Sequence, residues 1–338
     1  MVNSHPIAYA PSRDNPVGQV QQWSLTLERQ FKSDWMARMS YVGSTTNHLP
    51  FNESNINVPL TQTPNAPIQN QVPWQPWSQV LASRSGGMQH YESLQLEAIK
   101  RFAHGSSFQA EYLWDHSLDN VEIRAGNPQR WQFPGLDYGN TTYVQRQNLV
   151  FNYIYDLPFG QGKHWLSHLP KLADHLLGGW QVAGITQYST GVPLSVTFSV
   201  PSSVVGWWGG RADRVAGVPL YAGQQRGTHD VETGVQWFNP AAFAPPQEWT
   251  WGDSSRNSVF GPGQGNWDLS AHKNFSLTER LRMQFRADFF DAFNHFNLGS
   301  PYGGIADTRD GGLPVATSGK IYDGWDSRVI QLGLKFVF

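Results

Sequence analysis

One short connection of the chain carries histidines at the spacing of a metal site. His164 and His168 are four residues apart, which would place two imidazoles on one face of a helix, and His175 follows them. The glutamate that zinc proteases place between two such histidines is missing, and no third type of ligand is obvious. A solvated turn therefore explains these histidines better than a metal site.

The glycine-rich and serine-bearing segments do not have the spacing of catalytic or cofactor-binding motifs. The runs at 160–163 and 261–265 do not fit the strand–loop–helix cradle of a phosphate site, and both are interpreted as turns. No serine stands in a Gly-x-Ser-x-Gly nucleophile elbow. The sequence thus predicts that the chain is not an enzyme and has no catalytic, metal-binding or cofactor-binding residues.

Charged residues recur at alternate positions of several segments, where they would share one face of a strand. If those strands enclose water, the charged side chains would line the lumen and pair across strands, which is the favoured interpretation. The alternative is contact with a plug or with a passing ligand. The predicted lumen-facing residues are Arg38, Glu97, Glu111, Arg282, Arg286 and Asp288, with Glu28 on the same parity.

Four tryptophans fall in the longest predicted loop. They could stack on a sugar or peptide ligand, or they could pack the loop on itself, which is favoured. These candidate ligand contacts are Trp207, Trp208, Trp249 and Trp251.

The elements that must position these residues are strands, because apolar and polar side chains alternate with a period of two. The last stretch is the clearest, since Ile330, Leu332, Leu334, Phe336 and Phe338 share one parity up to the final residue. About nine segments follow the pattern: 22–28, 35–41, 93–98, 108–115, 149–156, 180–198, 267–272, 281–289 and 328–338.

The segment 180–198 is predicted as one long strand, bulged near Gly191 and Pro193, because its even-numbered residues are mostly apolar throughout. With it fused, short links around 32–34, 102–105 and 276–279 alternate with long ones at 43–90, 116–147, 199–265 and 295–327. The link 158–178 is intermediate, and its leucines predict a short amphipathic helix.

Short turns on one rim and long loops on the other are typical of an outer-membrane β-barrel, with the short turns periplasmic and the long loops extracellular. The fold class predicted is therefore all-β, an antiparallel transmembrane β-barrel. An odd number of about nine strands cannot close on itself, so residues 1–338 are predicted to be the C-terminal part of a larger barrel domain, without its plug and N-terminal strands.

Composition agrees with this prediction and excludes several classes. There is no cysteine, 15% of residues are charged, and 15 are tryptophan, a residue favoured at membrane interfaces. No apolar run of about 18 residues is present, so no transmembrane helix is expected. No basic cluster is present, which argues against a nucleic-acid partner. The mean hydropathy of −0.45 does not argue against a barrel, whose lipid-facing residues alternate with polar ones.

The start of the chain has no signal-peptide pattern, which indicates a cytoplasmic chain or an internal start within a longer gene.

In the order and spacing of its segments, the chain resembles the C-terminal portion of TonB-dependent receptor barrels, most closely the Oar-like group. The segments that carry this resemblance are 91–102, 112–120, 157–163, 177–184, 237–243, 256–263, 266–275 and 281–296. The resemblance implies a barrel of about 22 strands. It also implies a bacterial outer-membrane location, contact with outer-membrane lipid, and uptake or surface binding of a small ligand that the sequence does not identify. An energy-coupling protein would act only through N-terminal parts that this sequence lacks.

The last strand also resembles the signal that barrel-assembly machinery reads. A polar residue, a glycine that permits close approach and two outward aromatics suit strand addition to that machinery. The residues concerned are Gln331, Gly333, Phe336 and Phe338.

Two other functions stay open at this point. A soluble secreted Trp-rich β domain that binds carbohydrate would be recovered without detergent, unlike a membrane barrel. A small complete outer-membrane channel would close on itself and migrate differently on a gel before and after heating.

Overall fold

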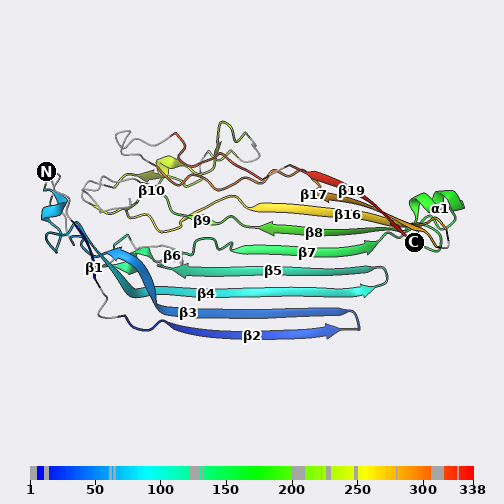
Figure 1. The fold of residues 1–338 in the computed structure, drawn as a ribbon, viewed down its shortest axis with the longest axis horizontal. Coiled ribbons are helices and arrows are strands. Elements are labelled where there is room, and N and C mark those ends of the chain that lie inside the picture. The colour runs from blue at the N-terminus through cyan, green and yellow to red at the C-terminus, as the bar shows by residue number, and fades with distance from the viewer. Residues whose placement is uncertain are drawn as a thin grey trace.

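The computed structural model describes residues 6–10, 15–60, 63, 66–121, 129–130, 132–198, 210–221, 223–225, 230–246, 250–278, 280–305, 316–325 and 327–338. A single large sheet dominates these residues, and its strands lie side by side over most of the length of the molecule (Figure 1). Among the described residues, no helix is long and apolar enough to cross a membrane.

The main path of the sheet has nine strands, in the order β2–β3–β4–β5–β7–β8–β16–β17–β19, and every neighbouring pair is antiparallel. Their bounds are β2 Gln19–Phe31, β3 Trp35–Asn55, β4 Gln79–Ala103, β5 Ser106–Asp119, β7 Gln147–Asp156, β8 Trp180–Ser189, β16 Gln264–Ser276, β17 Arg282–Phe290 and β19 Val329–Val337. β1 (Ile7–Ala10) adds to β4 and β6 (Gly139–Asn140) adds to β5. Each predicted strand segment corresponds to one strand of this path, so the all-β antiparallel prediction is confirmed.

The connections alternate between the two ends of the sheet. Those at 32–34, 104–105, 157–179 and 277–281 meet at one end, which we call the short-turn rim (Figure 1). Those at 56–78, 120–146, 190–263 and 291–328 meet at the opposite end, the long-loop rim. Three connections of the short-turn rim have two to five residues, whereas 157–179 has 23, as many as 56–78. The tightest turn is His104–Gly105, where both residues have positive φ angles (53° and 76°), as a two-residue hairpin of primed type requires.

Two predicted boundaries are wrong. β3 and β4 continue far past residues 43 and 90, so the loop between them is only 56–78, and the extension contains register shifts between 47 and 54. The strand predicted over 180–198 stops at Ser189, because Pro193 has no N–H to donate and Gly191 lies directly against the backbone of Gly261.

The break does not shift the register. Ser189 pairs with Gln264, and four residues further along each chain Pro193 pairs with Phe260. The bond from the amide of Gly261 to the carbonyl of Val192 (2.9 Å) lies on the same ladder. β9 (Pro193–Leu194) and β15 (Val259–Phe260) therefore extend β8 and β16 outward, which explains why the parity of 180–198 is continuous in the sequence.

The register places the alternating apolar side chains of all nine strands on one side of the sheet. Leu27 pairs with Met39, Met39 with Leu96, Leu96 with Tyr112 and Tyr112 with Leu149, and directly paired residues point to the same side. We call this side the apolar face; its members include Leu25, Leu27, Met39, Tyr41, Leu94, Leu96, Tyr112, Trp114, Leu149, Phe151, Val182, Leu269, Ala271, Phe285, Phe289, Leu332 and Leu334.

The two outermost strands have partners on one edge only. Within the described residues β2 pairs with β3 alone and β19 pairs with β17 alone, and every residue of both strands is exposed. No second sheet of described residues covers the apolar face, so the arrangement is not a two-layer sandwich. The sheet is an open wall rather than a closed barrel.

The main buried core lies outside the sheet, in the loops of the long-loop rim. One cluster joins Val196, Phe238, Phe243 and Val259 of loop 190–263 to Ile305 of loop 291–328. A second joins Val235 to Leu298 and Ile321, next to the pair β13 (Val235–Gln236) and β18 (Lys320–Ile321). We call the described residues of the four long loops the loop layer; its other short elements are η1 Ile68–Asn70, η2 Pro134–Asp137, β10 Thr197–Phe198, β11 Gly210–Arg211, β12 Asp213–Arg214, η3 Pro240–Ala242 and β14 Phe243–Ala244.

Candidate functional site

Aromatic side chains gather at both ends of the apolar face. Trp35 and Phe108 form an edge-to-face pair (4.9 Å between ring centroids) near the short-turn rim, while Tyr188 and Trp267 pair (6.1 Å) near the long-loop rim. On β16, Trp267 and Phe275 are eight residues apart, about 26 Å at 3.3 Å per residue. This spacing suits the outward apolar band of outer-membrane barrels, which is about 25 Å tall and flanked by aromatic girdles.

Within the described residues, the side chains of Lys100, Lys273 and Arg29 bring positive charge to the apolar face close to the short-turn rim, and no motif in the sequence marks them. Lys100 donates to the carbonyls of Ala103 and Ser106 (2.7 Å each), so its ammonium reaches the turn rather than the middle of the face. Lys273 donates to the carbonyl of Gly178, and the guanidinium of Arg29 lies over the ring of Phe31 (5.2 Å). Long cationic side chains whose stems cover apolar surface while their heads reach the interface are typical of a membrane boundary. In the sequence, the only indication of this role is that each of the three cations shares the parity of the apolar residues and lies near a strand end.

The opposite side of the sheet, which we call the polar face, carries the residues predicted to face the lumen. Glu28, Arg38, Glu97 and Glu111 are direct neighbours across four strands. Arg38 bonds Glu28 (2.8 Å) and Glu97 (2.9 Å), and Gln109 donates to the carboxylates of both Glu97 (3.0 Å) and Glu111 (2.5 Å). The structure therefore brings this group together as one cross-strand ladder.

The second predicted group lies across the sheet from the first. Arg286 bonds Asp288 through Nε (2.8 Å), and His272, paired with Arg286 in the register, contacts the side chain of Gln181. Arg282 lies on the same face at the start of β17, opposite Ser276 and Val337. All six candidate residues share the polar face, and its exposure to a lumen stays a prediction.

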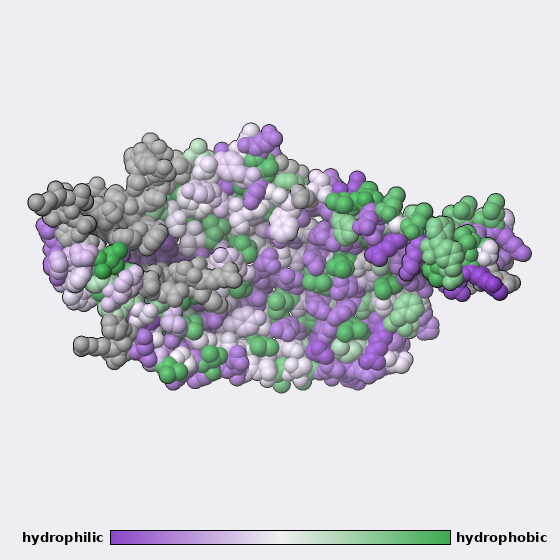
Figure 2. Space-filling view, viewed as in Figure 1, coloured by the Kyte–Doolittle hydropathy of each residue, from purple (hydrophilic) through white to green (hydrophobic). Residues whose placement is uncertain are grey.

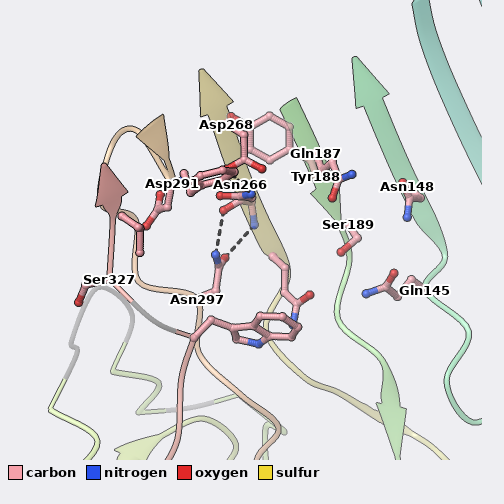
Figure 3. Close-up of a pocket in the computed structure, with 15 residues that line it drawn as sticks. Gln145, Asn148, Gln187, Tyr188, Ser189, Asn266, Asp268, Asp291, Asn297 and Ser327 are labelled. Atoms are coloured by element: carbon pink, nitrogen blue, oxygen red, sulfur yellow. Dashed lines mark hydrogen bonds between the residues drawn. The ribbon is translucent and has the colours of Figure 1, made fainter. Parts of the chain in front are cut away.

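A polar hollow of about 480 Å³ opens where β7, β8 and β16 reach the long-loop rim (Figure 3). Its lining includes Asn148, Gln187, Asn266 and Asp268 on the polar face, and the side chain of Asn297 closes one wall through two bonds to the backbone of Gly265 (2.8 and 2.9 Å). None of its described lining residues is Lys, Arg or His. Within the described part of the chain, the side-chain amides of Asn148 and Gln187 make no hydrogen bond. No motif in the sequence marks this hollow, because its members come from three strands and from the loops of the long-loop rim.

Two buried ion pairs join loop 190–263 to loop 120–146 and to the end of β5. Arg211 contacts Asp137 and also donates through Nε to the carbonyl of Ser254 (2.7 Å). Arg256 contacts Asp119 in the same way, and both members of each pair are buried. The described residues of loops 120–146 and 190–263 therefore form one unit.

Of the four tryptophans named as candidate ligand contacts, Trp251 lies within the described residues. The Arg130 guanidinium lies over Trp251 (5.4 Å) and Phe133 (4.6 Å), and burial lowers the pKa of that arginine. Trp251 thus takes part in loop-to-loop packing. Trp207, Trp208 and Trp249 lie outside the described residues.

The proposed assembly residues lie on the outermost strand β19 and just beyond it. Gln331 and Gly333 are on the polar face, opposite Asp288 and Arg286, while Phe336 is on the apolar face and terminal Phe338 is 96% exposed. A side chain at Gly333 would meet no atom within 4 Å, so the close approach expected at this glycine is not present within the described chain. A partner strand would have to supply it.

The histidines of connection 157–179 do not share a helix face. α1 (Lys171–Leu177) begins only after Pro170. If the helix started earlier, Pro170 would lie inside it, and proline has no backbone N–H to donate there. His164 and His168 precede it, and only His175 lies on it. In the described part of the chain, no three His, Asp or Glu side chains come together in a possible metal site.

Comparison with solved structures finds large outer-membrane proteins at low similarity. BauA, the ferric preacinetobactin receptor of Acinetobacter baumannii, has a TM-score of 0.47 and 9% identity, over 94% of this chain and 29% of that one. The outer-membrane transporter YddB of Escherichia coli has 0.46 and 8%, over 99% and 34%. The FrpB iron transporter of Neisseria meningitidis (F3-3 variant) has 0.44 and 11%, over 98% and 33%. The chain spans about a third of the length of these proteins, and no curated protein matches it.

A family model gives the assignment directly. The model of the outer membrane beta barrel domain matches residues 2–331, nearly the whole chain. The antiparallel sheet with one apolar and one polar face agrees with that match, and both indicate the bacterial outer membrane as the location. This chain belongs to the family of outer membrane beta barrel domains.

Proposed function

We propose that this chain forms one section of the wall of an outer-membrane receptor or transporter barrel of the TonB-dependent, Oar-like kind. Its apolar face contacts hydrocarbon, its polar face lines the lumen, the short-turn rim is periplasmic and the loop layer is extracellular. The observation that carries the proposal is the register of nine strands, which gathers the alternate apolar side chains on one uncovered face between aromatic ends. In water such a face would drive aggregation.

The rest of the barrel comes from further strands that pair with the free edges of β2 and β19. An unpaired strand edge in hydrocarbon leaves N–H and C=O groups without partners, each at a cost of several kcal/mol. A plug and a segment that meets the energy-coupling protein belong to the same larger protein.

The ligand side of the proposal rests on the hollow at the long-loop rim. Unbonded amides beside carboxylates, with no cation in the described lining, suit a small uncharged polar ligand better than an anion. The ladder around Arg38 serves to solvate and order the lumen wall. Trp207, Trp208, Trp249 and Trp251 are expected mainly to pack the loops.

The experiment that tests the proposal compares extraction of the expressed chain with and without detergent. We expect the folded chain to stay with the membrane fraction until detergent is added. Recovery of folded chain in the aqueous fraction would reject the membrane function. Reading the gene upstream of residue 1 tests the larger-barrel part: in-frame strands and a plug are expected there, and a promoter followed by a signal peptide would contradict it.

A further inference from the structure

Connection 157–179 differs from the other members of the short-turn rim. The other connections of this rim have two to five residues, whereas this one has 23 and contains α1. The amide of Gly160 bonds the carbonyl of Trp165 (3.0 Å), and Asp174 accepts from the amide of Gln161 (2.6 Å). A segment with this many internal bonds is an ordered element rather than a loose linker.

α1 is fixed on the side of the apolar face. Trp180 donates through Nε1 to the carbonyl of Leu176 (2.9 Å), and the ring of His175 meets that of Phe275 edge-on (6.3 Å). Lys273 donates to the carbonyl of Gly178, directly after the helix. Since Trp180 and Lys273 are paired on the apolar face, the helix lies at the border of that face on the short-turn rim.

The apolar side of this helix points away from the protein. Leu172 and Leu176 are one turn apart and are 79% and 60% exposed, and Leu177 and Trp165 are also exposed. Asp174 faces the connection itself, and the exposed His175 contacts Phe275 of the sheet. Figure 2 shows apolar atoms gathered over the end of the molecule that carries α1. A helix on a water-exposed rim would have the opposite orientation.

Basic groups flank the exposed leucines. Lys163, His164, His168 and Lys171 are exposed in the same connection. An apolar helix side continuous with a lipid-contacting face, bordered by lysines, has the composition of an interfacial amphipathic helix.

We propose that α1 lies in the headgroup region of the periplasmic leaflet, with Leu172 and Leu176 in the acyl boundary and Lys163 and Lys171 against anionic phospholipid headgroups. The proposal rests on the membrane function above. It makes the lipid monolayer the partner of this surface, rather than a second copy of the chain or another protein. The helix then fixes how deep β8, β16 and β17 sit in the membrane.

The test uses the absence of cysteine in the chain, so that one introduced thiol reports one position. The full chain is folded into vesicles of phosphatidylethanolamine and phosphatidylglycerol with an environment-sensitive fluorophore on Leu172→Cys. Leu96→Cys, on the apolar face of β4, reports membrane insertion of the sheet, and Leu60→Cys, exposed beyond β3, reports water. We expect blue-shifted emission and quenching by spin-labelled lipid at positions 172 and 96 but not at 60.

The outcomes separate the two proposals. A shielded label at 96 with a water-exposed label at 172 overturns the helix proposal and leaves the membrane function intact. Water exposure at both positions overturns both. Neutralising Lys163 and Lys171 together to glutamine should reduce quenching at 172 in vesicles that contain phosphatidylglycerol, whereas Lys335→Gln on the polar face should not. Equal quenching at 172 with and without the two lysines in vesicles that contain phosphatidylglycerol would contradict the headgroup part.

Discussion

Charged pairs in this protein have two different settings, and these settings give them different energetic weight. Arg38 and Glu28 on the polar face are both about half exposed, so water screens their attraction. Arg211 and Asp137 in the loop layer are almost fully buried, where the attraction is strong and the cost of leaving one charge unpaired is high. An arginine–carboxylate pair therefore orders exposed side chains on the polar face of the sheet, whereas the same kind of pair in the loop layer fixes two loops to each other.

Asp137→Asn should open the loop layer locally. The substitution keeps the shape but leaves the Arg211 guanidinium buried without a counter-charge, at an expected cost of about 3–5 kcal/mol. Hydrogen exchange at the amides of Arg211 and Ser254 would measure the change, since both amides bond across the layer. Glu28→Gln is the matched control and should change protection by about 1 kcal/mol at most, as for exposed pairs. Unchanged exchange in Asp137→Asn would show that the pair does not fix the loops.

At the scale of the elements, the nine main strands could be predicted because apolar and polar side chains alternate in each of them with a period of two. The core of the loop layer could not. Phe238, Val259 and Ile321 are buried in separate short elements, and no periodicity links them in the sequence. A local feature of segment 237–243 does indicate ordered structure: Asn239 caps the short helix η3 by accepting a hydrogen bond from the amide of Ala241 (3.1 Å).

The sequence predicted each polar-face residue by parity, but not its partners. Partners depend on the register between strands, and hairpin turns fix that register only for adjacent strands. The hollow around Asn148 and Gln187 needs β7, β8, β16 and a distant loop at once, so only the assembled sheet defines it.

Two adjacent substitutions on β4 test the two faces. Leu96→Arg places a charge near the middle of the apolar face and should destabilise the membrane-inserted sheet by about 2–4 kcal/mol. Gln95→Arg points to the polar face and should have little effect. Urea unfolding in vesicles measures both. Similar losses for the two variants would mean that both faces are packed against protein.

Deletion of Phe338 tests the assembly role of the last strand. Its side chain contributes little to the fold because it is almost fully exposed, so folding in detergent should be unaffected. We expect lower amounts of the parent protein in the outer membrane and accumulation in the periplasm, measured by fractionation. Val337→Ala serves as the control, since Val337 points to the polar face. Normal amounts after the deletion would argue against the signal.

At the scale of the whole molecule, the protein is a thin wall joined to a compact loop layer. The wall has little buried interior, so under the proposed function we expect its stability to depend on lipid and on further strands. The loop layer buries its own apolar residues and depends on the sheet mainly for anchoring.

A gel comparison of the isolated chain and the parent protein tests this view. The isolated chain, with two open edges, should run at the same position before and after heating, because no closed barrel resists the detergent. The parent protein should shift on heating. A heat-dependent shift of the isolated chain would instead identify a small closed channel.

The shared interior of the loop layer also limits how this surface can change over time. Phe238 and Phe243 pack edge-to-face (5.9 Å) in a cluster that also contains Ile305, so a substitution at any one of them requires compensation at the others. Exposed positions of the same loops carry no such requirement. Sequence differences between relatives of this chain should therefore concentrate at the exposed positions of these loops, while the buried positions change together or not at all.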